Sequence, residues 1–237
     1  MSFMVPEVEA VFSPIKKGMW IQYQVGIVFD FPQTSAYSSN EAMKLAMLSG
    51  FYGVPGQSLS GIKYSLYNIE GIRVEITDVT ENGCVTNASL VMKDGQREPW
   101  RGDAADRHSN FCNKAKENSS LKIGDTPFDP VGIAPATGPI PLEGAFKDMK
   151  VKEFSTITIN DKKIDVIIAN AKEISYNPGK SETEVEVIFH RYTGLLIGFS
   201  MGSSSTAGNQ TGTFSFSFYA NDVSEHFVEK PIVSVVN

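Results

Sequence analysis

Apolar and polar residues alternate along much of this chain, with the period of two that is typical of β-strands. The clearest run is Phe214, Phe216 and Phe218, which alternate with Ser215 and Ser217. Successive side chains of a strand point to opposite faces, so the three phenylalanines share one face. That face must be buried, because an exposed row of phenylalanines on an extended segment promotes aggregation.

Other extended segments support the same class of structure. Met19–Phe31 is rich in Ile, Val, Tyr and Phe and ends before Pro32, which predicts one or two strands with Trp20 at one end of the core. A further extended pattern begins at Ile62, continues through Tyr64–Leu66 and leads to Val74 and Ile76. We therefore expect most of the chain to be in β-strands.

Three short turn signals lie between alternating segments and predict three β-hairpins. An Asn-Gly pair is favoured in two-residue hairpins because a type I′ turn needs positive φ at both central positions. The turn residues are Asn82-Gly83, Asn160-Asp161 and Thr193-Gly194.

The strand before the third turn carries Glu182, Glu184 and Glu186 in alternation with Val185 and Val187. The glutamates therefore share one face of the strand. We interpret this face as solvated, and not as a metal site, because hard-cation sites gather their ligands from loops.

One segment has the period of a helix instead. Ser38 and the glutamate three residues later form a capping box, Met43, Ala46 and Met47 fall on one face, and Gly50 is expected to end the helix. Flexible methionines suit an adaptable apolar pocket, although plain core packing explains them equally well.

Together these patterns predict a mainly β protein: a single antiparallel domain over residues 1–237, either a curved half-barrel or a sandwich, with one or two short helices. Residues 96–141 have no sustained period and are expected to form a long irregular loop, with a short helix inside Asp103–Glu117. Ser203–Gly212 predicts a flexible turn or exposed loop tip, and Ile232–Val236 a last, edge strand.

Charge argues against nucleic acid as a partner, and hydropathy argues against a membrane-spanning segment. The formal net charge is -6, and no basic run is longer than Lys16-Lys17 or Lys162-Lys163, so a nucleic-acid backbone would be repelled. No apolar stretch reaches the ~18 residues that a membrane span needs. Met1–Phe12 lacks a basic n-region and a continuous apolar h-region, which indicates either a cytosolic start or a signal segment already removed.

The two cysteines, Cys84 and Cys112, are expected to form a disulfide if the protein works in an oxidising compartment. Two unrelated thiols in a reducing cytosol are the alternative. Three N-glycosylation sequons, at Asn87, Asn118 and Asn209, are close to the roughly two expected by chance. We read these features as pointing to an extracytoplasmic or secreted protein.

The segment Gly198–Gly202 matches the G-x-S-x-G pattern of serine hydrolases, with Ser200 as the nucleophile. The pattern requires a helix directly after the serine, and the Ser, Gly and Thr residues that follow are poor helix formers. Only Asp222 and His226 remain downstream to complete a triad. We interpret the match as coincidental and expect no enzyme.

Other motifs fail on spacing. Pro178–Ser181 resembles the end of a P-loop, but Ile174 occupies the position of its first glycine. Arg101–Asp103 is an adhesion-type tripeptide that is too short to carry a function alone. His108, His190 and His226 are far apart without zinc-site spacing, and His190 is expected at the surface. No metal or cofactor is predicted.

Four short segments together carry a resemblance: Gly18–Tyr23, Val74–Val79, Met92–Gly95 and Tyr192–Leu196. They resemble the hairpin signatures of uncharacterised extracytoplasmic prokaryotic proteins with a half-open β-barrel, similar to lipoprotein carriers. The resemblance skips residues 96–141. It implies a curved antiparallel sheet around an apolar cavity, helices over the open side, and binding rather than catalysis.

Two functions of different class follow. The first is a binding protein for an apolar or lipid-like small molecule. The second is a structural or adhesive subunit of a surface filament, shell or appendage. In such a subunit, Met1–Phe12 or Ile232–Val236 would add a strand to the open edge of another copy. A hydrolase that uses Ser200 ranks third. The expected ligand-binding residues are Trp20, Met43, Met47, Phe214, Phe216 and Phe218.

Overall fold

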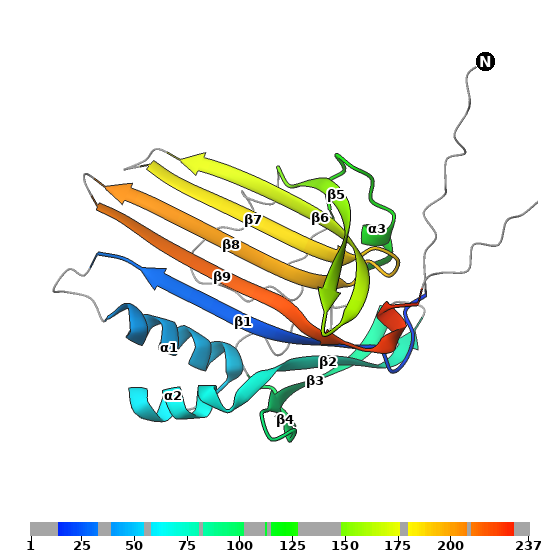
Figure 1. The fold of residues 1–237 in the computed structure, drawn as a ribbon, viewed down its shortest axis with the longest axis horizontal. Helices are drawn as coiled ribbons and strands as arrows, with labels where there is room; N and C mark the ends of the chain where they lie inside the picture. The colour runs from blue at the N-terminus through cyan, green and yellow to red at the C-terminus, as the bar shows by residue number, and fades with distance from the viewer. Residues whose placement is uncertain are drawn as a thin grey trace, which may run out of the picture.

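All nine strands of the described chain belong to one antiparallel sheet, with the order β4-β3-β2-β1-β9-β8-β7-β6-β5 (Figure 1). The computed structural model describes residues 14–32, 39–54, 58–80, 83–101, 112, 115–127, 148–175, 180–207 and 210–229. The sheet is open, and three short helices accompany it, so the predicted mainly β class is confirmed.

The strands are β1 (Trp20–Asp30), β2 (Ile69–Thr80), β3 (Gly83–Met92), β4 (Arg97–Pro99), β5 (Lys150–Ile159), β6 (Lys162–Ser175), β7 (Lys180–His190), β8 (Leu196–Ala207) and β9 (Gln210–Val223). The helices are α1 (Asn40–Tyr52), α2 (Leu59–Tyr67) and α3 (Ala115–Ser119), and a 3-10 turn, η3 (Glu225–Phe227), follows β9.

The three predicted hairpins are confirmed. β2 and β3 pair up to Thr80 and Gly83, and β7 pairs with β8 across the turn that contains Gly194. Between β5 and β6, Asn160 and Asp161 both have positive φ, at 44° and 64°. These are the backbone conformations that a type I′ turn requires, and Asn and Asp adopt them more readily than most residues.

Helix α2 corrects one prediction, because residues 62–67 are helical and not extended. Ser58 caps the helix by accepting a hydrogen bond from Gly61 N at 3.2 Å. Leu59, Ile62 and Leu66 recur at spacings of three and four residues, which is helical, while Ile62, Tyr64 and Leu66 taken alone imitate a strand. β2 begins only at Ile69.

Helix α1 is present where it was predicted, but its ends differ. Ser39 caps it, accepting a hydrogen bond from Ala42 N at 3.2 Å, whereas Ser38 lies outside the described residues. The helix continues past Gly50, because Gly53 supplies the left-handed residue, with φ 69°, that ends it. Two residues beyond Gly50, Phe51 and Tyr52, therefore belong to the helix, and both are buried.

The prediction of a flexible turn or exposed loop tip over Ser203–Gly212 is too wide, because only the residues between Ala207 and Gln210 connect the two strands. β8 runs to Ala207 and β9 begins at Gln210, so both strands cross this segment. Its threonines favour extended backbone and pair across the strands, as Thr206 and Thr211 do with hydroxyl oxygens 3.1 Å apart. The loop predicted over 96–141 contains β4 and α3, and most of its remainder lies outside the described residues, as do Met1–Phe12 and Ile232–Val236.

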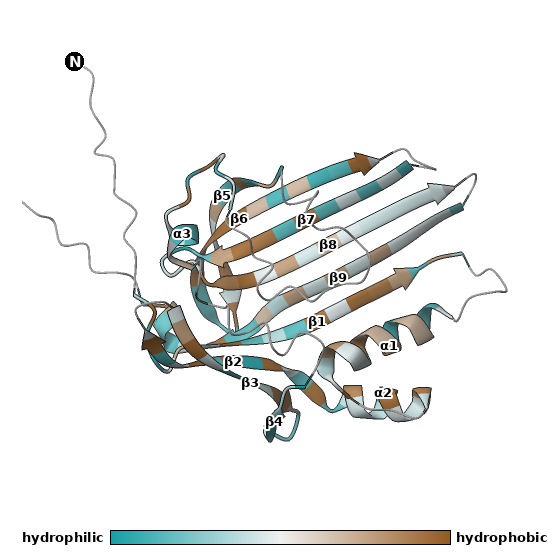
Figure 2. Ribbon diagram, turned by 180° about the vertical axis from the view of Figure 1, so that it is seen from behind, coloured by the Kyte–Doolittle hydropathy of each residue, from teal (hydrophilic) through white to brown (hydrophobic). Residues whose placement is uncertain are grey.

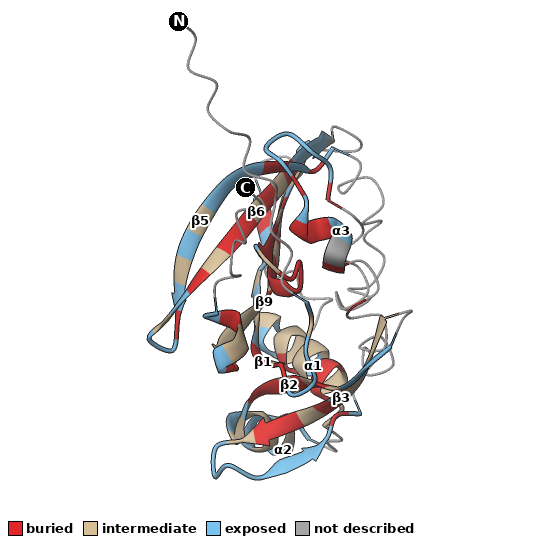
Figure 3. Ribbon diagram, turned by 90° about the vertical axis from the view of Figure 1, so that its right-hand side faces the viewer, coloured by how far each residue is buried: buried red, intermediate tan, exposed pale blue. Residues whose placement is uncertain are grey.

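The sheet divides into two arms after Tyr23. β1 pairs with β2 only from Trp20 to Tyr23, whereas its pairing with β9 extends to Asp30. We call β2, β3 and β4 the short arm, and β1 with β9 to β5 the long arm. Helix α1 packs against the β1 edge that β2 leaves: Val25 N donates to the Tyr52 hydroxyl at 3.3 Å. In Figure 3, α1 and α3 lie on one side of the sheet and the β5–β6 hairpin curls to the other.

Candidate ligand-binding face

The long arm has a continuous apolar surface, which we call the inner face, formed by side chains that share a side with Phe216. The alternation that creates it is visible as bands along β6 and β7 in Figure 2. Cross-strand partners place its residues in rows that run across the strands. The first row is Ile27, Phe216, Met201, Val185 and Ala171, and the second is Val25, Phe218, Phe199, Val187 and Ala169.

The third row lies next to the first row, and it is apolar on two strands but polar on the other three. Phe29 and Phe214 continue the apolar surface on β1 and β9. On β8, β7 and β6 the same row holds Ser203, Thr183 and Glu173. The hydroxyl oxygens of Ser203 and Thr183 are 3.3 Å apart and hydrogen-bonded. The inner face therefore passes from apolar to polar along the strands, and only on one half of its width.

Side-chain size also falls across the inner face. Both apolar rows run from phenylalanine on β9, through valine on β7, to alanine on β6, where Ala169 and Ala171 stand. An alanine fills much less space above a sheet than a phenylalanine. The shortest side chains therefore lie over β6 and β7, next to the polar half of the third row.

Over β9, the inner face is closely packed by aromatic side chains of neighbouring elements. Phe51 of α1 lies over the strand, with its ring centre 6.0 Å from that of Phe216 and 5.8 Å from that of Phe218. Tyr23 stacks on Phe218 at 4.2 Å, and the Trp100 indole N–H donates to Phe51 O at 2.8 Å. The prediction that the three phenylalanines share a buried face is confirmed.

The structure separates the other residues that the sequence grouped with the phenylalanines. Met47 is half-buried and packs on the core, Met43 is half-buried, and Ala46 is exposed, because the helix buries the face of Leu45, Phe51 and Tyr52 instead. Of the two methionines, only Met47 adjoins the core that contains the phenylalanines.

Trp20 is not part of the inner face. Strand alternation directs its neighbour Ile21 into the core, and the Trp20 ring lies with Arg73, whose guanidinium carbon is 3.5 Å from the ring centre. Lys162 Nζ is 5.8 Å from the same ring. Trp20 therefore belongs to a second, polar cluster on the other side of the sheet.

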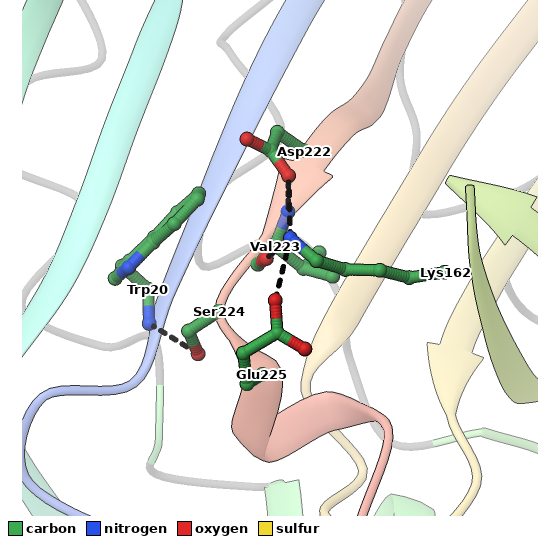
Figure 4. Close-up of polar contacts among 6 residues, drawn as sticks. All are labelled: Trp20, Lys162, Asp222, Val223, Ser224 and Glu225. Carbon is green, nitrogen blue, oxygen red and sulfur yellow. Dashed lines mark hydrogen bonds and ion pairs between the residues drawn. The ribbon is translucent and has the colours of Figure 1, made fainter. Parts of the chain in front are cut away.

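That cluster is centred on Lys162, the first residue of β6 (Figure 4). Its ammonium lies 3.0 Å from an Asp222 carboxylate oxygen and 3.4 Å from a Glu225 carboxylate oxygen, and it donates to Val223 O at 2.7 Å. Burial works against the charge of Lys162, but the hydrogen bonds with the two carboxylates outweigh it and raise the pKa. The cluster joins the β5–β6 turn to the end of β9.

His190 is buried, with 1% of its surface exposed, which corrects the expectation of a surface histidine. Its Nδ1 is 2.8 Å from the Thr193 hydroxyl, and its ring packs edge-on against Tyr192 and Phe227. Burial lowers the pKa of His190 to about 4, so the ring is neutral at physiological pH. The sequence did not reveal this, because Phe227 reaches His190 from 37 residues further along the chain.

Ser200 lies in the middle of β8, opposite Glu186 on β7 and Ser217 on β9. The G-x-S-x-G segment is thus strand throughout, without the strand-to-helix turn that exposes a nucleophile. The two downstream candidates for a triad are engaged elsewhere: Asp222 with Lys162, and His226 with Glu229 at 3.0 Å.

Cys84 and Cys112 form the predicted disulfide, with their Cα atoms 5.6 Å apart. This bond links the start of β3 on the short arm to the residue three before α3. The first residue of α3, Ala115, packs on the turn of the long arm, where a Cβ on Gly194 would overlap the Ala115 carbonyl. The disulfide and α3 together therefore bridge the two arms.

The three sequons differ in accessibility. Asn87 is exposed on β3, whereas the side chain of Asn118, in α3, is only 4% exposed. A buried asparagine has no room for a glycan in the folded chain, so the expectation of glycosylation does not fit Asn118. Asn209 lies outside the described residues.

No helix of the described chain is long and apolar enough to cross a membrane. Among the same residues, no three His, Cys, Asp or Glu side chains gather as metal ligands would. The sequence matches no protein-family model, and neither curated proteins nor solved structures gave a match. The resemblance to half-open β-barrel carriers stays a prediction.

Proposed function

We propose that this chain is a non-enzymatic, extracytoplasmic binding protein for an amphiphilic, lipid-like molecule. The inner face carries the proposal: two apolar rows cross five strands of an open sheet, and the third row ends in Ser203, Thr183 and Glu173. An alkyl chain of the ligand would lie over the alanine and valine positions of β6 and β7. Its polar head would meet the hydroxyls of the third row.

Burial of the inner face sets a condition on this proposal. Met201, Val185 and Phe216 are almost fully buried without any ligand, so an incoming alkyl chain must displace what covers them. Helix α1 is the described helix that packs on β9, through Phe51. Helix α1 packs along the unpaired edge of β1 and is not held by the hydrogen bonds between strands. We therefore expect α1 to move when a ligand binds.

The disulfide supports the proposed compartment. Cys84 and Cys112 are bonded, and such bonds persist in oxidising surroundings such as the periplasm or the cell exterior. This supports an extracytoplasmic location, in which a carrier for a poorly soluble molecule has a clear use.

Titration of the purified chain with a fluorescent fatty acid tests the proposal. Ala171→Phe puts a large ring where we propose that the alkyl chain lies, and should weaken binding about tenfold or more. Lys172→Phe is the matched control, because the next residue of the strand points to the opposite, exposed face. No saturable binding by the wild type, or equal binding by both variants, would refute the proposal.

Assembly by strand addition is the second candidate, and the position of β5 favours it. β5 is the last strand of the sheet, and among the described residues its free edge is bonded only at Val151, to Gly124 and Asp125. An unpaired strand edge is a template for another strand. Sedimentation of the chain over a wide range of concentration decides this: a chain that remains monomeric throughout excludes assembly.

A further inference from the structure

Helix α2 exposes large apolar and aromatic side chains to an unusual extent. None of its nine residues is buried. Tyr64 is 73% exposed, Tyr67 70% and Leu59 52%. Figures 1 and 2 both place α2 on the outside of α1, away from β1, so it forms the outermost layer at this corner of the molecule.

The attachment of α2 to the fold does not require these three side chains. Leu66 packs against the core, and Ile62 is half-buried. The carboxamide of Asn68 donates to Tyr64 O at 3.2 Å and helps to close the last turn. Packing and capping therefore explain the helix, but they do not explain why the two tyrosines and Leu59 face solvent.

The size of this surface argues against a second protein as its partner. Tyr64, Tyr67 and Leu59 together expose on the order of 400 Å², taking about 200 Å² for each fully exposed large side chain. A stable protein interface buries about 800 Å² on each partner. The surface is thus about half of what a stable dimer through α2 would need, while a membrane requires no matching shape.

The chemistry of α2 matches a bilayer surface. Tyrosine has an apolar ring and a polar hydroxyl, the combination that favours the boundary between lipid headgroups and acyl chains. The helix contains one lysine, Lys63, and no acidic residue, although the chain as a whole has a net charge of -6. Lys93 Nζ lies 3.5 Å from the centre of the Tyr67 ring, which adds a second cation beside the tyrosines. Lys63 is paired with Glu41 of α1 at 3.3 Å, so anionic headgroups are attracted chiefly by Lys93.

We propose that α2 is a membrane-docking helix, which lies in the headgroup layer of a phospholipid bilayer with Tyr64, Tyr67 and Leu59 inserted. Docking stands on the exposed side chains of α2 and on Lys93 beside them. Only its use rests on the proposed function: a docked α2 would hold α1, the helix over the inner face, next to a source of lipid.

Flotation with vesicles of phosphatidylcholine containing about one third phosphatidylglycerol tests the docking. We expect the wild type to float and the double variant Tyr64→Ser/Tyr67→Ser to lose about tenfold or more of its vesicle affinity. Val28→Ser is the control: Val28 is 54% exposed on β1, so it removes exposed apolar surface, in a smaller amount, away from α2. All the changed side chains are exposed, so we expect each variant to fold normally. Circular dichroism of each variant checks this.

Three results would overturn the proposal: failure of the wild type to float, equal flotation of the double variant, or a dimer that the same two substitutions dissociate while no vesicle binds. The fatty-acid titration uses no vesicles and is therefore a separate measurement. We expect the α2 double variant to keep fatty-acid binding and Ala171→Phe to keep flotation, so either proposal can fail without the other.

Discussion

Lys162 and Asp222 are 60 residues apart in sequence, yet the Lys162 ammonium lies 3.0 Å from the Asp222 carboxylate. Lys162 follows the turn of the β5–β6 hairpin, and Asp222 is the last residue but one of the central strand β9. The hairpin belongs to the edge of the sheet, and this ion pair fixes its tip to the middle of the sheet. Together with the hydrogen bond from Lys162 to Val223 O, the ion pair holds the turn of the hairpin against the end of β9.

Lys162→Ala should lower the free energy of unfolding by about 1–3 kcal/mol, because it leaves Asp222 and Val223 O without a partially buried cation that both bind. Urea unfolding measures the loss. Lys172→Ala removes a lysine whose side chain is half-exposed, in an ion pair with Glu182, and should change stability by less than about 0.5 kcal/mol. Equal effects of the two substitutions would contradict the anchoring role of Lys162.

His190 predicts a specific dependence of stability on pH. Its pKa is about 4 in the folded chain and about 6.5 when unfolded, so between these values only the unfolded chain gains a proton. The stabilisation is complete above pH 6.5 and is lost as the pH falls towards 4, by about 2 kcal/mol at pH 5 and about 3 kcal/mol in total. His190→Gln should remove this part of the slope, whatever its effect at neutral pH.

Chemical denaturation of both chains at intervals from pH 7.5 to 4.5 measures that difference. Carboxylates contribute to the slope of each chain alike, so only the difference between wild type and variant reports on His190. Parallel curves would show that His190 titrates in the folded chain much as it does in water.

The disulfide predicts a loss of stability on reduction. Cys84 and Cys112 are 28 residues apart, and closing a loop of that length restricts the unfolded chain by about 3–4 kcal/mol. Cys84→Ser/Cys112→Ser should lose about this amount in thermal unfolding. Since the bond and α3 bridge the two arms, amide exchange should accelerate first in Ala115–Ser119, before the strands of the long arm. Uniform acceleration along the chain would contradict a bridging role.

Periodicity in the sequence revealed most of the strands, but not all of them and not the side chains that pack around them. Phe214, Phe216 and Phe218 revealed their buried face because strand alternation is local and strict. Ile62, Tyr64 and Leu66 were misread because a short apolar run with period two also fits part of a helix, and the deciding residues were Leu59 and the cap Ser58.

The sites that depend on distant contacts were not predictable in this way. Trp20 joins Arg73 and Lys162, and His190 meets Phe227, only because the hairpin curls over the sheet and η3 folds back. The polar third row was also hidden, since Ser203 lies in a serine-rich stretch that by composition resembles a loop. Its significance appears only once Thr183 and Glu173 stand beside it on one face.

Gly194 provides the most sensitive test of how α3 sits on the long arm. Its φ is 69°, and a Cβ at this position would lie 1.6 Å from Ala115 O, a backbone atom that cannot rotate away. Gly194→Ala should therefore destabilise the chain by about 3 kcal/mol or more, from strain in the turn together with the displacement of α3.

Gly95 has a similar φ, 83°, with nothing within 4 Å of the corresponding Cβ, so Gly95→Ala isolates the backbone cost at about 1 kcal/mol. Thermal unfolding of the two variants separates the contributions. If both lose the same stability, α3 does not press on the Gly194 turn in solution, and the bridge between the arms must rest on other contacts.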